Sequence, residues 1–379
     1  MSASHLTVGS IFRAHGREFL ARYGETIPAH QRRALRSLSL CRTQELGGHV
    51  VRCPECGYER EHYNSCYCRG CPQCEGSKEA AWLLERESEL LPTPYYHVVF
   101  PLPHVLNELL LENQRIGFSL FFQAVAYTLK KVARDKLGGD LGFFCVLHTW
   151  GQLLTTHFHL HCVVPGGVML PDGRWKASSQ KGRYLLPEKV LLLVFKGVFL
   201  RRLRRAQAQG KLRYSGNFEE LLHRVGRKRW TMHTEPPFGS PLHMLKYLAR
   251  YTRKVALSNS RLVSLNDGMV EFTWKDYANN CDKKVCRLDA IEFIRRFLSH
   301  IPPPGFVRIR HYGFMVGKKR KERLAALKDE ILWTLPKPIP RPVTNGSFQP
   351  GKCPECKRAA LLIVAGILIT KAAKKRDSS

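Results

Sequence analysis

A run of nine residues, THFHLHCVV at positions 156–164, alternates three histidines with apolar side chains. Successive side chains of a β-strand point to opposite faces, so this pattern predicts a strand with His157, His159 and His161 on one face. Three adjacent imidazoles are costly to bury unless something binds them. The strand therefore either presents an exposed polar face or holds a metal ion.

The charge of the chain indicates the kind of partner it binds. Its 379 residues correspond to two or three domains, and a hydrophobic content of 44% is ample for a core. The formal net charge is +30, from 61 basic and 31 acidic residues. An excess of this size favours a polyanionic partner, which is nucleic acid or, less often, an anionic membrane surface.

Neither a secretory signal nor a membrane span is expected. The opening MSASHLTVGSIFRAHGREF lacks an apolar core segment. The longest apolar run, residues 359–369, has eleven residues and is too short to cross a bilayer. We therefore expect a cytoplasmic protein with no membrane partner, in which the thirteen cysteines serve metal ligation rather than disulfides.

A cysteine-rich loop lies at residues 53–74. Two Cys-x-x-Cys pairs, separated by fourteen residues, predict one structural zinc ion held by Cys53, Cys56, Cys71 and Cys74. Cys66 and Cys68 are surplus: Cys66 is the first substitute for a pair member, and a second ion with His62 is the alternative. The distant pair Cys353 and Cys356 is either half of a site or a plain turn.

The remaining pattern mixes helices and strands, which predicts an α+β chain. Strands are expected at 95–102, 142–151 and 156–164, a hairpin at 169–175, and two strands around the turn at 266–268. Helices are expected within 1–50 and at 78–91, 104–136, 187–208, 240–256 and 289–299. We place domain boundaries near residues 94 and 301. This division predicts a helical and zinc-binding domain at 1–94, a central domain at 95–300 and a basic extension at 301–379.

The helix expected at 240–256 carries Tyr247 and Tyr251, which share one face at i and i+4. Arg250, Arg253 and Lys254 lie beside them. A tyrosine pair of this kind usually packs against a core. With basic neighbours and a metal strand upstream, the alternative is two nucleophiles that face a phosphate.

Several longer motifs resemble one family. They are YYHVVFPLPHVLN, LHTWGQ, HFHLHCVVPGG, YLARYTRKVALSNSRL and FTWKDY, together with the cysteine loop. The chain resembles the HUH endonuclease superfamily and, more narrowly, the two-tyrosine rolling-circle transposases of the insertion sequence ninety-one family, which carry an amino-terminal zinc-binding domain. The resemblance implies a nuclease core made of an antiparallel sheet with helices on one face. The histidine strand is then central, with a small zinc-binding domain before the core.

Site residues follow from the resemblance by position. It implies His159 and His161 as ligands of a catalytic Mg or Mn ion, with His157 the less favoured alternative. For the third ligand, His148, Gln152 and His157 are all open. Tyr247 and Tyr251 are the implied nucleophiles. The expected DNA-binding residues are Arg250, Arg253, Lys254, Arg261 and Lys275.

The activity implied by the resemblance is that of a transposase. Such an enzyme nicks and rejoins single-stranded DNA at insertion-sequence ends through 5′-phosphotyrosine intermediates, and its partners are single strands and hairpin ends. Two alternatives remain at this point. One is a plasmid replication initiator or relaxase with the same chemistry, and the other is a catalytically inert, zinc-containing DNA-binding protein.

Overall fold

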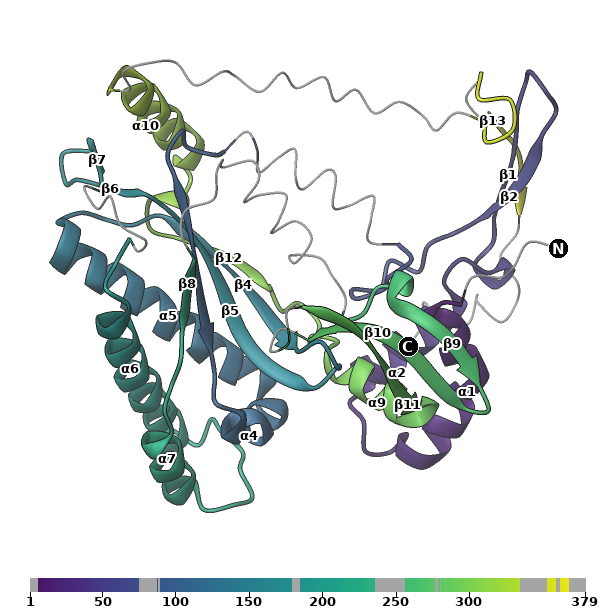
Figure 1. Ribbon diagram of the computed structural model, residues 1–379, viewed down its shortest axis with the longest axis horizontal. Helices are drawn as coiled ribbons and strands as arrows, with labels where there is room; N and C mark the ends of the chain where they lie inside the picture. The colour runs from purple at the N-terminus through teal and green to yellow at the C-terminus, as the bar shows by residue number, and fades with distance from the viewer. Residues whose placement is uncertain are drawn as a thin grey trace. The chain divides into compact units, whose positions relative to one another are not determined.

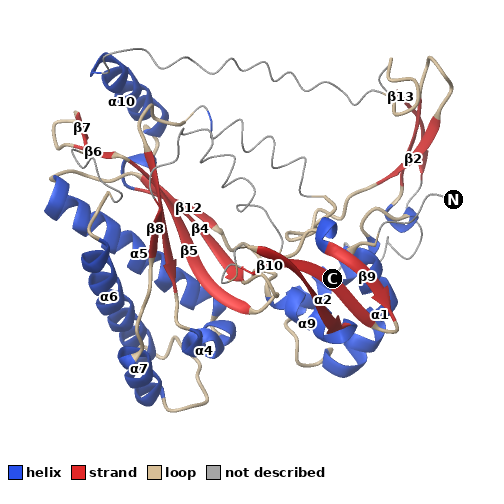
Figure 2. Cartoon of the chain, viewed as in Figure 1, coloured by secondary structure: helices blue, strands red, loops and turns tan. Residues whose placement is uncertain are grey.

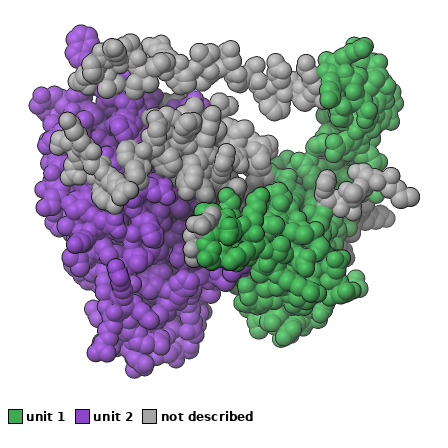
Figure 3. Space-filling view, viewed as in Figure 1, with its two compact units in different colours: residues 1–77, 257–301, 340–379 green, residues 78–256, 302–339 purple. Residues whose placement is uncertain are grey.

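The computed structural model describes residues 6–74, 87, 89–178, 185–235, 256–276, 279, 281–334, 353–358 and 362–367. The chain forms two compact units (Figure 3). Unit 1 comprises Met1–Ser77, Leu257–Ile301 and Pro340–Ser379, and unit 2 comprises Lys78–Ala256 and Pro302–Ile339. This interleaved division differs from the three consecutive domains predicted, because segments far apart in sequence pack into the same unit. Among the described residues, no helix is long and apolar enough to span a membrane.

Unit 2 is built on a five-stranded antiparallel sheet (Figures 1 and 2). Its strand order is β12-β4-β5-β3-β8, which makes the histidine strand β5 central, as predicted. The bounds are β12 Ile309–Tyr312, β4 Phe143–Trp150, β5 Thr156–Pro165, β3 Tyr95–Pro101 and β8 His233–Glu235. In β5, one face carries Phe158, Leu160 and Cys162, all buried in the main core, and the other carries the histidines.

Helices cover the apolar face of this sheet (Figure 1). They are α4 Asn107–Glu112, α5 Gln114–Leu137, α6 Glu188–Ala208 and α7 Phe218–Arg227. The single helix expected at 104–136 is divided into the 3₁₀ turn η2 (His104–Leu106), α4 and α5. The break falls at Asn113, whose side-chain amide donates to the Leu109 carbonyl oxygen and accepts from the Arg213 amide. An asparagine that offers its own hydrogen bonds competes with the helical ladder at that position.

Smaller elements complete unit 2. The predicted hairpin is formed by β6 Gly167–Met169 and β7 Trp175–Ala177 around Gly173, which has a φ of +89°. The turn η4 (Gly313–Met315) and α10 (Arg320–Thr334) add a second apolar cluster with Leu91. The helix predicted at 78–91 lies almost wholly outside the described residues, and the one at 240–256 lies outside them except for Ala256.

In unit 1, helices pack beside a three-stranded sheet. The helices are α1 Val8–Tyr23, α2 Ala29–Leu40 and α9 Ala290–Ser299, and the sheet consists of β9 Leu262–Asn266, β10 Met269–Asp276 and β11 Asp282–Asp289. Short 3₁₀ turns are η1 Gln44–Leu46 and η3 Asn259–Arg261. Phe12 of α1 meets Phe297 of α9 edge to face, with ring centroids 5.5 Å apart. This contact joins residues nearly 300 positions apart, which explains why the unit is discontinuous in sequence.

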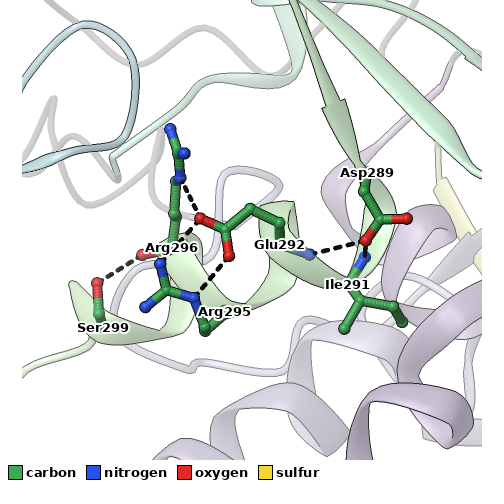
Figure 4. Close-up of polar contacts among 6 residues, drawn as sticks. All are labelled: Asp289, Ile291, Glu292, Arg295, Arg296 and Ser299. Atoms are coloured by element: carbon green, nitrogen blue, oxygen red, sulfur yellow. Dashed lines mark hydrogen bonds and ion pairs between the residues drawn. The ribbon is translucent and has the colours of Figure 1, made fainter.

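Helix α9 illustrates how local sequence sets a boundary (Figure 4). The Asp289 carboxylate caps its first turn by accepting from the amides of Ile291 (2.9 Å) and Glu292 (3.2 Å). Glu292 in turn accepts from Arg295 and Arg296. The Arg295 contact is the main reason that the pKa of Glu292 falls to about 2.

The last part of unit 1 is a small sheet that we call the ribbon. It consists of β1 Gly48–Arg52, β2 Glu59–Tyr63 and β13 Leu362–Ile367, in the order β13-β1-β2. All five residues of β2 except Tyr63 are exposed, as are all of β13 except Ile367. The ribbon therefore has little apolar core of its own.

Candidate metal centres

Three histidines converge on the face of the unit 2 sheet opposite the main core. His159 and His161 lie on β5, and His148 of the neighbouring strand β4 stands directly opposite His159 in the antiparallel register. One ring nitrogen from each residue lies within 4.8 Å of the other two. His148 and His161 are buried, at 3% and 7% exposure, and His159 is half-buried. The sheet itself thus brings three imidazoles to one point.

Hydrogen bonds determine which nitrogen each imidazole offers. The Nδ1–H of His159 donates to the His157 carbonyl oxygen at 2.9 Å, because a carbonyl can only accept. The remaining lone pair of neutral His159 is then on Nε2. A metal-binding histidine commonly donates its other ring N–H to a backbone carbonyl of this kind, which fixes the orientation of the ring.

A second chain of contacts orients His161. The Glu235 carboxylate lies 2.9 Å from Nδ1 of His97, and Nε2 of His97 lies 2.7 Å from Nδ1 of His161. Since a carboxylate accepts, His97 donates from Nδ1, and in that tautomer its Nε2 accepts from the Nδ1–H of His161. His161 is left with its lone pair on Nε2. Strands β3, β5 and β8 therefore build a carboxylate–histidine–histidine relay.

The protonation state of the cluster suits metal binding. Burial lowers the pKa of His159 to about 3, and burial followed by the nearby His148 lowers the pKa of His161 well below its usual value. Both imidazoles are thus neutral near pH 7, the form that ligates a cation. Imidazole nitrogens suit divalent transition metals, whereas Mg²⁺ prefers oxygen ligands.

Of the alternatives for the third ligand, the geometry favours His148 over His157. Nδ1 of His157 contacts Nε2 of His104 at 3.2 Å instead. The spacing in the sequence could not distinguish these two, because only the β4–β5 register places His148 beside His159.

The cysteines form two clusters rather than one. The first contains Cys41, Cys66, Cys71 and Cys74, and the second contains Cys53, Cys56, Cys353 and Cys356. In each cluster the four sulfurs lie within 4.8 Å of one another. This arrangement corrects the predicted grouping of Cys53, Cys56, Cys71 and Cys74, and Cys66 is a full member of the first cluster instead of a substitute.

The physical reason for the correction lies in tertiary packing. Cys41 lies at the end of helix α2, and its sulfur is 3.4 Å from the sulfur of Cys71. This contact cannot be predicted from Cys-x-x-Cys spacing. Hydrogen bonding among the thiols lowers the pKa of Cys74 and raises the pKa of Cys66 and Cys71. Four sulfur donors in this arrangement suit tetrahedral zinc.

Other predicted site residues are only partly covered by the structure. Tyr247, Tyr251, Arg250, Arg253 and Lys254 lie outside the described residues. Arg261 and Lys275 are described and belong to unit 1, not to the unit that holds the histidines. Lys275 is exposed on β10, whereas the Arg261 guanidinium donates to the Thr273 carbonyl at 2.7 Å and lies over Phe272.

Sequence reasoning missed Cys41, His97 and Glu235, and it left open whether Cys353 and Cys356 form half of a site or a plain turn. His97 had a weak signal, since it is a histidine in an otherwise apolar buried strand, YYHVVFP. Glu235 had none, because β8 contributes only three residues to the sheet.

Comparisons with known proteins point in one direction. The family described as "Putative transposase" matches residues 142–323, and the family "Transposase zinc-binding domain" matches residues 11–102. "Putative transposase y4qJ" of Sinorhizobium fredii is 43% identical over 349 residues, covering 89% of this chain and 87% of the relative. "Transposase for insertion sequence element IS801" of Pseudomonas savastanoi pv. phaseolicola is 26% identical over 311 residues, which cover 79% of this chain and 74% of the relative. No solved structure matches significantly.

Proposed function

This chain belongs to the IS91 family of transposases, and from that premise we propose that it nicks and rejoins single-stranded DNA through 5′-phosphotyrosine intermediates on Tyr247 and Tyr251. The observation that carries the proposal is the convergence of His148, His159 and His161 on the central strand of the sheet. An ion held by these three imidazoles would keep coordination positions open for phosphate oxygens. A bound divalent ion would polarise the phosphodiester and stabilise the charge that develops on those oxygens.

The chemistry assigned to the chain's own residues balances without water. A tyrosine hydroxyl attacks phosphorus, a Tyr–O–P bond forms, and the bond from phosphorus to the 3′-oxygen breaks. The phenol proton is passed on balance to the leaving 3′-oxygen, which becomes a free hydroxyl. A free phenol has a pKa of about 10 and is a poor nucleophile at neutral pH, so a divalent ion held by His148, His159 and His161 would aid its attack by activating the phosphodiester. The energy of the broken bond is kept in the phosphotyrosine for rejoining.

Two tyrosines allow two DNA ends to be held in turn. Positions i and i+4 of a helix lie roughly 6 Å apart, so both phenols of the expected helix could reach one phosphate. We expect a strand to pass from one phosphotyrosine to the other during rolling-circle transposition. Either tyrosine alone would then support nicking but not complete transfer.

The charge of the chain supports single-stranded DNA and hairpin ends as partners. A net charge of +30 favours a phosphate-tracking surface, and Lys275 together with Arg250, Arg253, Lys254 and Arg261 supplies candidate contacts. If some six phosphates are neutralised, log affinity should fall with log salt with a slope of about −4 on single strands. A flat salt response would contradict this part of the proposal.

Covalent capture on a single-stranded element end tests the reaction and its polarity. A 3′-labelled strand should yield a labelled protein band on a denaturing gel in the presence of Mn²⁺. The same strand labelled at the 5′ end should yield a short DNA fragment with a free 3′-hydroxyl and no labelled protein. Label in the protein from the 5′-labelled strand would reverse the proposed linkage.

Matched variants separate nucleophiles from packing residues. Tyr247→Phe and Tyr251→Phe should each retain some adduct and lose complete transposition, and the double variant should form none. Tyr127→Phe is the control, because Tyr127 is exposed on α5 and remote from the histidine face in the same unit. Full adduct formation by the double variant would place the nucleophile on another residue. No adduct with the parent protein would leave a DNA-binding protein without this chemistry.

A further inference from the structure

The second cysteine cluster joins two segments that lie about 300 positions apart in the chain. Cys53 and Cys56 come from the amino-terminal part, and Cys353 and Cys356 from the carboxyl-terminal part, all within unit 1. We propose that these four thiolates form a second structural zinc site, which fastens the carboxyl-terminal segment that includes β13 to strands β1 and β2. The matched zinc-binding domain ends at residue 102 and so contains only half of this site.

The two halves of the site have the same local shape. Both read Cys-Pro-Glu-Cys, and in both the amide of the residue after the second cysteine donates to the carbonyl of the first. These bonds are Gly57 to Cys53 at 3.0 Å and Lys357 to Cys353 at 2.9 Å. The donors have left-handed φ values of +70° and +56°. A lysine rarely adopts this conformation, and it persists where the surroundings over-determine the turn.

The sulfur separations match a tetrahedral ion better than disulfides. Cys53 and Cys356 have their sulfurs 3.6 Å apart, and Cys56 and Cys353 have theirs 3.7 Å apart. A tetrahedron with Zn–S bonds of about 2.3 Å has sulfur–sulfur edges of about 3.8 Å. A disulfide bond is about 2.05 Å long and joins cysteines only in pairs. Four mutually close sulfurs therefore point to one ion.

Strand pairing brings the same two segments together independently. β13 follows the second Cys-Pro-Glu-Cys turn and pairs antiparallel with β1, from Gly48 opposite Ile367 to Arg52 opposite Leu362. β1 also pairs with β2, and both adjoin the first turn. With most of β2 and β13 exposed, this sheet has little apolar burial to hold its ends in place. A metal ion supplies that missing stability in small domains of this kind.

Metal counting on the full chain tests the proposal. Native mass spectrometry with elemental analysis should find two zinc ions per chain, with the histidine site kept empty by omission of Mn²⁺ and mild washing. Cys353→Ser/Cys356→Ser should hold one zinc, and Cys281→Ser/Cys286→Ser, whose cysteines lie in neither cluster, should hold two. One zinc in the parent, two in the Cys353→Ser/Cys356→Ser variant, or iron in this site would overturn it.

A second measurement needs no variant and so does not depend on folding of a mutant. Alkylation of the native protein with N-ethylmaleimide, read by peptide mass spectrometry, should spare Cys53, Cys56, Cys353 and Cys356 together. After zinc is removed with a strong chelator, all four should react. Reaction of Cys353 and Cys356 before chelation would overturn the proposal. Protection that yields only to a reducing agent would assign disulfides instead.

Discussion

The histidine centre and the ribbon bring their metal-binding residues together in opposite ways. The histidine centre draws on β4 and β5, neighbouring strands in both sequence and space, above a core of more than forty buried side chains. The ribbon draws on segments from both ends of the chain and exposes most of β2 and β13. The first site is held by a fold that exists without it. The second, we infer, helps to create the fold around it.

The difference concerns what each metal contributes. A preformed site binds its ion with little change in structure, so the ion is available for chemistry. In a site whose ligands are scattered in the unfolded chain, binding energy becomes folding energy. The comparison therefore predicts that the two regions respond separately to loss of metal.

Removal of zinc should have the largest effect. A structural zinc ion contributes about 10–16 kcal/mol of apparent binding energy, so a strong chelator should unfold β1, β2 and β13. The sheet of β4 and β5 should stay folded, because its apolar face is buried under α5 and α6. Hydrogen exchange measured strand by strand checks this. Continued protection of β1 and β2 without zinc would show that the ribbon does not need the metal.

Loss of a histidine ligand should come next. His148→Ala should weaken Mn²⁺ binding by more than about 100-fold, because loss of a residue that only hydrogen-bonds to a metal ligand already weakens metal affinity by up to about 100-fold. The chain should stay folded and keep its zinc. Mn²⁺ titration followed by electron paramagnetic resonance measures this directly. His223→Ala is the control, since His223 is exposed on α7. Equal affinities in the two variants would remove His148 from the centre.

Disturbance of the relay should be milder. Glu235→Ala leaves His97 without its carboxylate and so loosens the orientation of His161, which should weaken Mn²⁺ binding by about 10- to 100-fold. Glu235→Gln, which can still accept from His97, should recover part of the loss in the same titration. If Glu235→Ala binds Mn²⁺ like the parent, the relay does not position His161.

The smallest effect should distinguish the two Cys-Pro-Glu-Cys turns. Gly57→Ala adds a side chain at a φ of +70° and should cost about 1 kcal/mol, or about fivefold in zinc affinity. Lys357→Gly removes the strain of a side chain at a φ of +56°, but it also increases the conformational entropy of the unfolded chain. We therefore expect a smaller change, in the direction of tighter zinc binding. Competition with a chromogenic chelator measures both. Effects of the same sign would mean that the turns are not equivalent.

Much of the architecture was predictable because it depends on short-range pattern. The alternation of His159 and His161 with apolar residues predicted a strand with two different faces, and the family resemblance implied that this strand is central. The structure confirms both. The Asp267-Gly268 turn and the strands on either side were also predictable from the sequence, because Asp-Gly is a preferred pair in hairpin turns whose two central residues have positive φ. The two-tyrosine helix remains a prediction, because Tyr247 and Tyr251 lie outside the described residues.

The sequence by itself determined the residue types: a histidine strand, many thiols in metal-binding spacing and a large positive charge. Only the tertiary structure decided which of them meet. Cys41 joins Cys71 because helix α2 ends beside it, and His97 reaches His161 through the register of β3 on β5. Cys353 meets Cys56 through the pairing of β13 with β1. The physical reason is that spacing constrains ligands only within one turn or strand, whereas partners hundreds of residues away are chosen by strand pairing and packing.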